Sequence, residues 1–223
     1  MTESLEFVAF DIETTGFAVT DTVTVVGFAV PMGVRVFCRT DGRPAPDLEV
    51  TVTDRVEQHV QLSTHASEEA MLEAVGAFTA ERLYDDDVLL VAFNGERWKA
   101  GFDLPFLRTR LTLTDVTWPF CEMPFADLLP VVTRRFNTTD GNGEARTDLV
   151  GVYETLCDGA YSEFDPFEES AEAVTAFEDG RFAELVLHNV ADVLRTRQLG
   201  LLAQRYCSKS DFQLKSLTPT IHD

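Results

Sequence analysis

Two carboxylates close the first apolar segment of the chain. Asp11 and Glu13 come directly after the run FVAF at residues 7–10. Because residues two apart in a β-strand project to the same face, these side chains are expected to lie side by side. Two ionised carboxylates at that separation repel each other unless a cation stands between them, and hard divalent cations prefer oxygen ligands. The pair indicates a site for Mg²⁺ or Mn²⁺, with two solvated acids at an exposed strand end as the alternative interpretation.

Two later stretches carry further candidate ligands. Asp103 follows a second apolar run and an Asn94-Gly95 turn, and it stands at the start of a predicted helix. An aspartate in that position is often only a helix cap, which stabilises a helix by about 1 kcal/mol. His188 and Asp192 are four residues apart in the longest helical pattern, so they share one helix face. A plain contact between these two side chains is the alternative to a catalytic role.

The elements that must position these residues follow from the apolar patterns. Strands are expected where β-branched and aromatic residues run together, at 5–10, 23–30, 34–38 and 88–93. Short turns between the first three predict antiparallel neighbours, and the continuous apolar run of the fourth is typical of a strand buried on both faces. Segment 50–60 has no clear pattern, and 137–146 is expected to be a loop. Helices are expected at 67–83, 104–113, 126–136, 149–157, 170–177 and 182–206.

This order of elements predicts an α/β fold with a mixed β-sheet, in which three antiparallel strands are followed by parallel strands and helices flank the sheet. The length of 223 residues suits one domain, so residues 1–223 are expected to form a single unit. With 45% hydrophobic and 10% aromatic residues, the chain is too rich in apolar side chains for a disordered protein. No apolar stretch reaches about 20 residues, so no membrane association is expected.

The cysteines and the first residues bear on where the protein works. Cys38, Cys121, Cys157 and Cys207 form no Cys-x-x-Cys pair, which argues against a zinc site and for reduced thiols. Residues 1–6 are polar and do not form a basic and apolar leader, which argues against export. A cytoplasmic location is therefore expected.

The net charge of −20 is the strongest bias in the composition, with 38 acidic against 18 basic residues. Only Lys99, Lys209 and Lys215 are lysines, and the acids are spread along the chain. Nucleic-acid binding ordinarily calls for a basic surface. In a cytoplasm with about 1 M salt, however, the Debye length falls to about 3 Å and surface repulsion is screened. The composition favours a halophilic protein, with an acidic mesophilic protein as the alternative.

Taken together, the three acidic stretches resemble the sequence blocks of the DEDD 3′–5′ exonucleases, a family with an RNase H-like fold that includes proofreading domains. The resemblance spans residues 5 to about 200 and is nearest to the subgroup whose third block reads Tyr-x-x-x-Asp. The chain departs from that subgroup in two places, because His188 stands where it has tyrosine and residues 95–101 lengthen the second block. The blocks here are Phe10-Asp11-Ile12-Glu13-Thr14-Thr15-Gly16, Asn94-Gly95 with Phe102-Asp103, and His188 to Asp192.

The resemblance implies a hydrolase that cuts phosphodiester bonds from the 3′ end of single-stranded DNA or RNA with two Mg²⁺ or Mn²⁺ ions. It implies that Asp11, Glu13, Asp103 and Asp192 hold the ions, with Asp11 between them. His188 would then act as the general base, which an ordinary pKa of about 6.5 allows, or would only orient the attacking water as a tyrosine does.

The resemblance also implies contacts to the substrate. The loop after the first strand would hold the terminal nucleotide, with Phe17 against a base, although a core position for Phe17 fits the sequence equally well. The lengthened second block carries Trp98 between Arg97 and Lys99, a cationic and aromatic cluster suited to a single strand. The candidate substrate-binding residues are Thr14, Thr15, Gly16, Phe17, Asn94 and Trp98.

Three other classes of protein fit parts of the pattern. The opening Asp-x-Glu-x-Thr is similar to the Asp-x-Asp-x-Thr of haloacid-dehalogenase-like phosphatases, which need an aspartate at position 13 and an assisting lysine. Residues 140–148 partly match a calcium loop, but Ala145 stands where that loop needs glycine. The third alternative is a nucleic-acid-binding protein that keeps the RNase H-like fold without turnover, which the missing tyrosine suggests.

Overall fold

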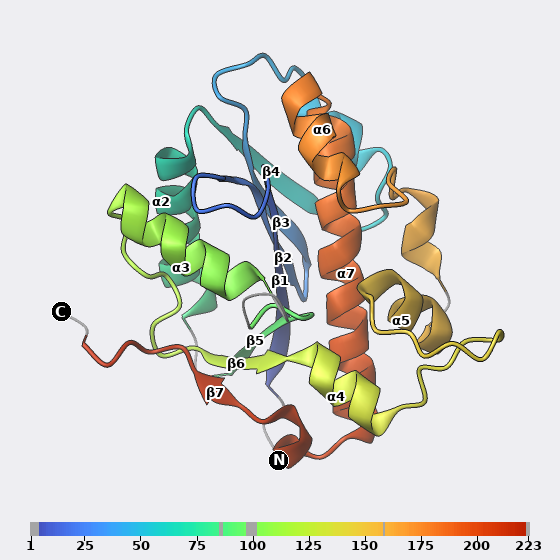
Figure 1. Cartoon of the computed structure of the whole chain (residues 1–223). Coiled ribbons are helices and arrows are strands. Elements are labelled where there is room, and N and C mark those ends of the chain that lie inside the picture. The colour runs from blue at the N-terminus through green and yellow to red at the C-terminus, as the bar shows by residue number, and fades with distance from the viewer. Residues whose placement is uncertain (1–4, 85–86, 97–101, 158, 222–223) are drawn as a thin grey trace.

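A seven-stranded mixed β-sheet forms the centre of the protein (Figure 1). This computed structural model describes residues 5–84, 87–96, 102–157 and 159–221. The strands are β1 (Glu6–Thr14), β2 (Val23–Val30), β3 (Gly33–Arg39), β4 (Val60–His65), β5 (Val88–Ala92), β6 (Pro124–Asp127) and β7 (Lys215–Ser216). Their order in the sheet is β4-β3-β2-β1-β5-β6-β7. Strands β1, β2 and β3 are antiparallel neighbours, whereas β1, β5 and β6 run parallel. At the two edges, β4 is parallel to β3 and β7 is antiparallel to β6.

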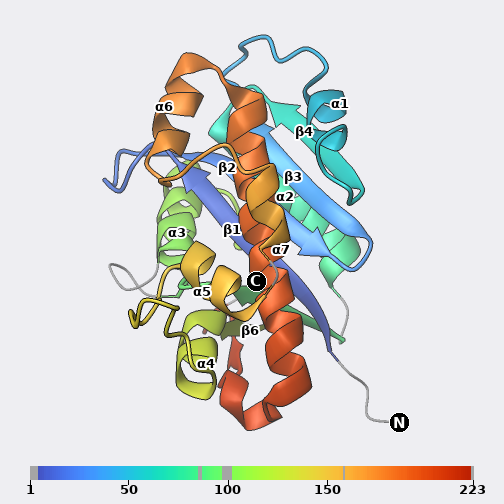
Figure 2. The ribbon, with the colours of Figure 1, turned by 90° about the vertical axis from the view of Figure 1, so that its right-hand side faces the viewer.

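Helices cover both faces of the sheet. They are α1 (Leu48–Thr53), α2 (Glu68–Phe78), α3 (Asp103–Thr114), α4 (Leu128–Arg135), α5 (Leu149–Leu156), α6 (Glu172–Asp179) and α7 (Phe182–Tyr206), with short helical turns η1 (Thr79–Leu83), η2 (Ala160–Glu163) and η3 (Lys209–Phe212). The long helix α7 lies across β1, β2, β3 and β5 on one face, where α1, α4, α5 and α6 pack against it (Figure 2). Helices α2 and α3 cover the opposite face (Figure 1).

The alternation of side chains along β1 decides where the candidate ligands point. Phe7 and Ala9 belong to the apolar core under α7, whereas Phe10 belongs to the core under α2 and α3. Because successive residues of a strand face opposite sides, Asp11 and Glu13 lie on the α7 face with Phe7 and Ala9. Both faces of β1 are therefore buried, and its polar residues meet the longest helix.

The expectation of an α/β fold with a mixed sheet flanked by helices is confirmed. Strand β1 extends to Thr14, so Asp11 and Glu13 lie within the strand and not after its end. The unassigned segment 50–60 completes α1 and leads into β4, a strand that the sequence pattern did not predict.

The prediction that a helix begins at residue 126 is wrong for its first two residues. Pro124–Asp127 form β6 beside β5, and α4 begins only at Leu128. An apolar run as short as this one shows no periodicity that separates a strand from a helix. Its parallel pairing with β5 makes it a strand, and the Asp127 side chain caps the helix that follows by accepting the backbone N–H of Leu129.

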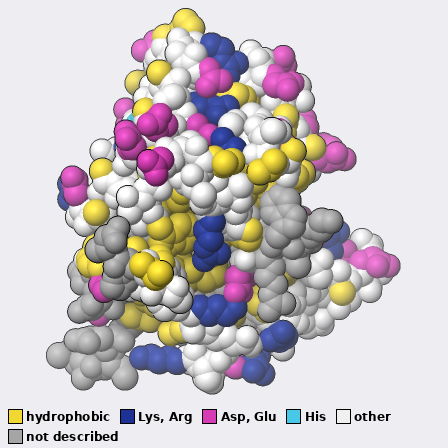
Figure 3. Space-filling view, turned by 60° about the vertical axis from the view of Figure 1, so that its left-hand side comes forward, with side chains coloured by type: hydrophobic (Ala, Val, Ile, Leu, Met, Phe, Trp, Pro, Cys, Tyr) yellow, Lys and Arg dark blue, Asp and Glu magenta, His cyan; other side chains and the backbone are white. Residues whose placement is uncertain are grey.

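Charged and apolar side chains are mixed on the surface. On the face that carries α2 and α3, Lys and Arg side chains form a broken column beside hydrophobic side chains (Figure 3). Most Asp and Glu side chains of this view lie in its upper half. Within the described ranges, no helix is both long and apolar enough to cross a lipid bilayer.

Candidate metal centre

Asp11 is held in place by the neighbouring strand and by α7. Gly27 of β2 lies opposite Asp11, and a Cβ atom at position 27 would stand 2.0 Å from Oδ1 of Asn189. The missing side chain lets Asn189 of α7 approach the sheet, where its Nδ2 donates a hydrogen bond to Asp11 Oδ2 at 2.9 Å. Asn189 is fully buried, and its Oδ1 has no hydrogen-bond partner among the described residues. The contact fixes the orientation of the Asp11 carboxylate.

Asp103 reaches the same place through the turn after β5. Asn94 has a left-handed backbone with φ of 59°, and its carbonyl accepts the backbone N–H of Phe102 at 3.0 Å. A Cβ atom on Gly95 would lie 2.8 Å from Asp103 Oδ2, so glycine leaves the room that this carboxylate occupies. Asp103 is the first residue of α3 and is 7% exposed, which makes it a buried acid and not a solvated cap.

Asp127 supports this turn, and it is a residue that the sequence patterns missed. Its carboxylate accepts the backbone N–H groups of Asn94 at 2.9 Å, Glu96 at 3.2 Å and Leu129 at 3.1 Å. Burial raises the pKa of Asp127 despite these hydrogen bonds, and the charge of Asp127 in turn raises the pKa of Asp103. The one available signal was an aspartate directly before the apolar run of α4, which reads as a helix cap.

A buried ion pair anchors the helix that carries Asp103. Arg110 of α3 pairs with Glu68 of α2 at 2.8 Å, and Glu68 also accepts the backbone N–H of Val23 at 2.8 Å. Both side chains are buried, and breaking such a pair typically destabilises a protein by about 3 to 5 kcal/mol. The pair therefore fixes α3 against α2 and β2, and with it the position of Asp103.

His188 and Asp192 project from successive turns of α7 toward Glu13. His188 Nε2 lies 4.0 Å from Glu13 Oε1 and 3.8 Å from Asp192 Oδ2. One ligand atom from each of the three residues lies within 4.8 Å of the other two. The shared helix face predicted for His188 and Asp192 thus meets the polar face of β1.

The charge of Asp192 on α7 acts on three carboxylates of β1 and α3, namely Asp11, Glu13 and Asp103. Burial and the charges of the other three raise the pKa of Asp11 well above its ordinary value. Burial and the charge of Glu13 are the main causes of a similarly raised pKa at Asp103. Burial raises the pKa of Glu13 to about 7. No cation of the described residues is a main cause of the pKa of Asp11 or Asp103, and this excess of negative charge is the electrostatic character of a divalent-cation site. This group, called the acidic cluster below, comprises Asp11, Glu13, Asp103 and Asp192.

His188 is surrounded by carboxylates. Burial lowers the pKa of His188, but the charges of Glu13 and Asp192 and the hydrogen bond and charge of Asp165 raise it to about 10. Among the protein's own charges the imidazole is therefore a cation, and the ordinary pKa assumed for a general base does not apply. Asp165 lies 23 residues before His188 in a segment rich in acids, and nothing in the sequence distinguished it from its neighbours.

The loop after β1 places Phe17 at the surface beside α3. Phe17 is 72% exposed, and its ring meets that of Phe102 edge-on with centroids 4.9 Å apart. A core position for Phe17 is therefore wrong. The Thr14 and Thr15 hydroxyls form hydrogen bonds within the loop, and Gly16 has a φ of 153°, which favours glycine. Arg97, Trp98 and Lys99 lie outside the described residues. Their contact with a single nucleic-acid strand therefore stays a prediction.

The structure bears on two of the alternative interpretations, the calcium loop at residues 140–148 and the dehalogenase-like phosphatase. Asp140 accepts the backbone N–H groups of Asn142 and Glu144 and closes a hairpin-like turn, which accounts for Asp140 as a turn residue. A phosphatase of the dehalogenase type needs a lysine close to Asp11. Lys215 pairs with Glu96, and Lys99 lies outside the described residues, so this alternative stays open.

The comparisons with known proteins do not assign the chain to a family. No protein-family model matches it, and no curated protein matches its sequence. The geometry of the acidic cluster is therefore the basis for inferring a function.

Proposed function

We propose that the protein is a metal-dependent 3′–5′ exonuclease that hydrolyses phosphodiester bonds of single-stranded DNA or RNA. The observation that carries the proposal is the electrostatic contact of four carboxylates from three separate elements, of which Glu13 and Asp103 are buried and Asp11 and Asp192 half-buried. Among them, Glu13 and Asp192 share with His188 a group of ligand atoms that lie within 4.8 Å of one another. Buried like charges oppose folding, and groups with strongly raised pKa values concentrate at functional sites.

The sheet supports the proposal of an RNase H-like fold. The antiparallel strands β3, β2 and β1 continue into the parallel strands β5 and β6, which is the arrangement that the resemblance implies. The carboxyl ends of β1, β5 and β6 meet at one edge, which is where ligands commonly bind in α/β sheets. Glu13, the turn at Asn94 and Asp127 all lie at these ends.

The donor set fits two Mg²⁺ or Mn²⁺ ions. Asp11, Glu13, Asp103 and Asp192 offer carboxylate oxygens, the ligands that these ions prefer, and their mutual repulsion calls for positive charge. These four residues would hold the ions. Bound there, two divalent ions supply the charge that stabilises both the attacking and the leaving oxygen of a phosphodiester.

The chain's own residues bind and orient the substrate in this proposal. Phe17 and Phe102 form an aromatic edge next to Asp103, on which the terminal base of a single strand stacks. Asn189 holds Asp11 through a hydrogen bond, and Asp127 holds the turn at Asn94 in the same way. The carboxylates therefore keep their positions while the substrate binds.

An exonuclease assay with a matched pair of variants tests the proposal. The full-length protein in high salt with Mg²⁺ or Mn²⁺ is expected to shorten a 5′-labelled single-stranded oligonucleotide from its 3′ end and to release mononucleotides. Asp103→Asn keeps the shape but removes the charge, so it should slow this reaction by at least about 100-fold, since even outer-shell changes cost 10- to 100-fold. Asp115→Asn makes the same change at the exposed far end of α3 and should leave the rate unchanged.

Full activity in Asp103→Asn would remove the two-ion proposal. Release of inorganic phosphate from a monoester without shortening of the oligonucleotide would favour the phosphatase alternative. Binding of the oligonucleotide without any cleavage, at every ion tried, would favour the inactive nucleic-acid-binding protein.

A further inference from the structure

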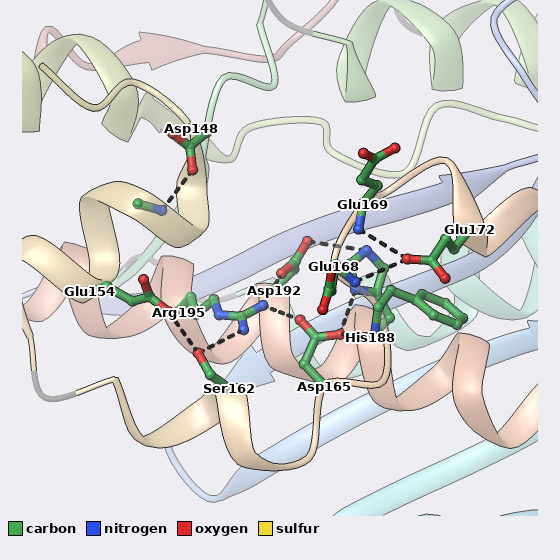
Figure 4. A network of polar contacts seen from close by, with 12 residues as sticks. Asp148, Glu154, Ser162, Asp165, Glu168, Glu169, Glu172, His188, Asp192 and Arg195 are labelled. Carbon is green, nitrogen blue, oxygen red and sulfur yellow. Dashed lines mark hydrogen bonds and ion pairs between the residues drawn. The ribbon is translucent and has the colours of Figure 1, made fainter. Parts of the chain in front are cut away.

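Asp165 controls the orientation of His188. Its Oδ1 lies 2.8 Å from His188 Nδ1, and only 4% of the Asp165 side chain is exposed (Figure 4). A carboxylate accepts and does not donate, so Nδ1 carries the hydrogen of this contact. The ring is therefore fixed with Nε2 pointing away from Asp165, toward Glu13 and Asp192.

Nε2 faces two carboxylate oxygens across a gap that is too wide for hydrogen bonds. The separations are 4.0 Å to Glu13 Oε1 and 3.8 Å to Asp192 Oδ2. Ligand atoms about 2.1 Å from a common ion stand about 3 to 3.5 Å apart. The third separation, between the Glu13 and Asp192 oxygens, is at most 4.8 Å, so a closure of about half to one ångström at each atom brings one nitrogen and two oxygens onto the same ion.

Arg195 pairs with both Asp192 and Asp165 and so holds these two carboxylates in place. Its Nη1 lies 2.7 Å from Asp192 Oδ1 and 2.5 Å from Asp165 Oδ2, and the residue is 1% exposed. One oxygen of Asp192 is therefore taken up by Arg195, and Oδ2 is the oxygen that faces His188. Figure 4 shows Asp165, His188, Asp192 and Arg195 joined in this way.

We propose that His188 Nε2 ligates one ion of the acidic cluster with Glu13 and Asp192, and that Asp165 is the positioning residue that aims it. A histidine that binds a metal through one nitrogen almost always gives its other N–H to a carboxylate or carbonyl, which is the contact that Asp165 makes. The ion replaces the Nε2 proton, which passes to solvent. This inference rests on the proposed function in so far as the acidic cluster binds divalent ions.

The chemical class of the ion follows from the mixed donor set. Mg²⁺ prefers oxygen ligands. Imidazole binds first-row transition ions such as Ni²⁺ and Zn²⁺ well, and Co²⁺ precedes Ni²⁺ in the usual order of affinity. The ion at Glu13, His188 and Asp192 is thus a transition ion in preference to Mg²⁺. The remaining acids, Asp11 and Asp103, offer oxygen alone.

Binding of Co²⁺ to the full-length protein, followed by proton NMR, tests the assignment. A paramagnetic Co²⁺ ion shifts the Nδ1–H resonance of an imidazole that it binds far outside the normal range, and this resonance disappears in D₂O. The wild-type protein should show such a resonance, His188→Gln should lose it, and the matched variant His59→Gln, at an exposed position, should keep it. A wild-type spectrum without the resonance, or a resonance that survives in His188→Gln, overturns the assignment.

Calorimetry on Asp165→Asn gives an independent readout. The variant keeps an oxygen that accepts from Nδ1 but loses the charge, and its Co²⁺ affinity should fall by about 10- to 100-fold. Its Mg²⁺ affinity should change much less, because Mg²⁺ does not use the imidazole. Equal losses for both ions would show general damage to the pocket and would overturn the role of Asp165.

The exonuclease assay separates this inference from the proposed function. Cleavage of single strands by a protein that lacks the imidazole resonance keeps the nuclease and overturns the ligand assignment. The resonance in a protein that cleaves no oligonucleotide keeps the ligand assignment and overturns the nuclease.

Discussion

The carboxylates of Glu13 and Asp103 are buried and that of Asp11 is half-buried, and this burial and the charges of neighbouring acids raise the pKa of all three groups. Each of them holds its proton at a pH at which an exposed acid would have lost it. A cation that binds there must displace these protons, and the gain from binding offsets the repulsion. Ionisation and ion binding at this site are therefore coupled.

The affinity for Mn²⁺ is expected to rise as the pH increases from about 6 to about 8. The pKa of Glu13 is raised to about 7, so this group loses its proton within that window and becomes a ligand. At lower pH the proton competes with the ion and the affinity falls. Calorimetry in buffers of different ionisation enthalpy would measure both the affinity and the protons released.

Glu13→Gln is the control for this behaviour, because it removes one of the titrating groups and should make the pH dependence between about 6 and 8 less steep while weakening the binding. A wild-type affinity that is constant over the window, with no proton release, would show that the raised pKa values do not govern ion binding.

The acids themselves were predictable from the sequence, but the residues that orient them were not. Asp11 and Glu13 stand two apart after an apolar run, and His188 and Asp192 stand four apart in a helix, so local periodicity was sufficient. Asn189 contacts Asp11 across 178 residues of sequence, and Asp165 contacts His188 across 23. Such contacts arise from the packing of α7 and of the segment before α6. The spacing of residues along the sequence carries no information about this packing.

Helix α7 carries the polar residues of the site because it packs very closely on β1 and β2. Gly27 allows this approach, since a Cβ atom there would overlap Asn189 Oδ1 at 2.0 Å and lie 3.2 Å from Val193 Cγ1. In a densely packed interior neither the strand nor the helix can yield without a cost. The position of α7, and with it that of His188 and Asp192, thus depends on a missing side chain.

Gly27→Ala is expected to destabilise the protein by about 1 to 3 kcal/mol, the usual range for an overpacked core. It should also weaken Mn²⁺ binding, because Asn189 is pushed away from Asp11. Gly76→Ala is the matched control: a Cβ atom there meets nothing within 4 Å, and alanine favours the helix α2 by about 0.5 to 1 kcal/mol. Denaturant unfolding measures both changes, and equal stability of Gly27→Ala and wild type would contradict this account of the packing.

The long, regular elements were predicted well, and the short strands at or next to the edges of the sheet were not. Helix α7 matches its predicted range because 25 residues of helical pattern leave little ambiguity. Strands β4 and β6 were missed because they have six and four residues, and their identity comes from pairing with β3 and β5. The extension of β1 to Thr14 was also missed. Its last residues include the acids Asp11 and Glu13, and acidic residues after an apolar run resemble the end of a strand.

The net charge of −20 acts on the protein as a single body and not at any one site. Acids spread over the chain repel one another in the folded state more than in the expanded unfolded state, and this repulsion opposes folding. Salt screens it, so a strongly acidic surface is compatible with stability where the ionic strength is high. We propose on this ground that the protein works at high ionic strength.

The midpoint of thermal unfolding is therefore expected to rise by several degrees between about 0.1 M and about 2 M KCl, with a chelator present to exclude bound divalent ions. A parallel series in sucrose, which stabilises by exclusion and not by screening, shows how much of the shift is general. A midpoint that does not move in KCl would contradict the halophilic interpretation.

Diffraction from crystals soaked in Mn²⁺, with anomalous difference maps, bears most directly on the claim that the acidic cluster is a two-ion centre. The expected result is two peaks about 3.5 to 4 Å apart among the carboxylates of Asp11, Glu13, Asp103 and Asp192. A map with no peak at these four residues, at an Mn²⁺ concentration that occupies sites elsewhere on the surface, would contradict it.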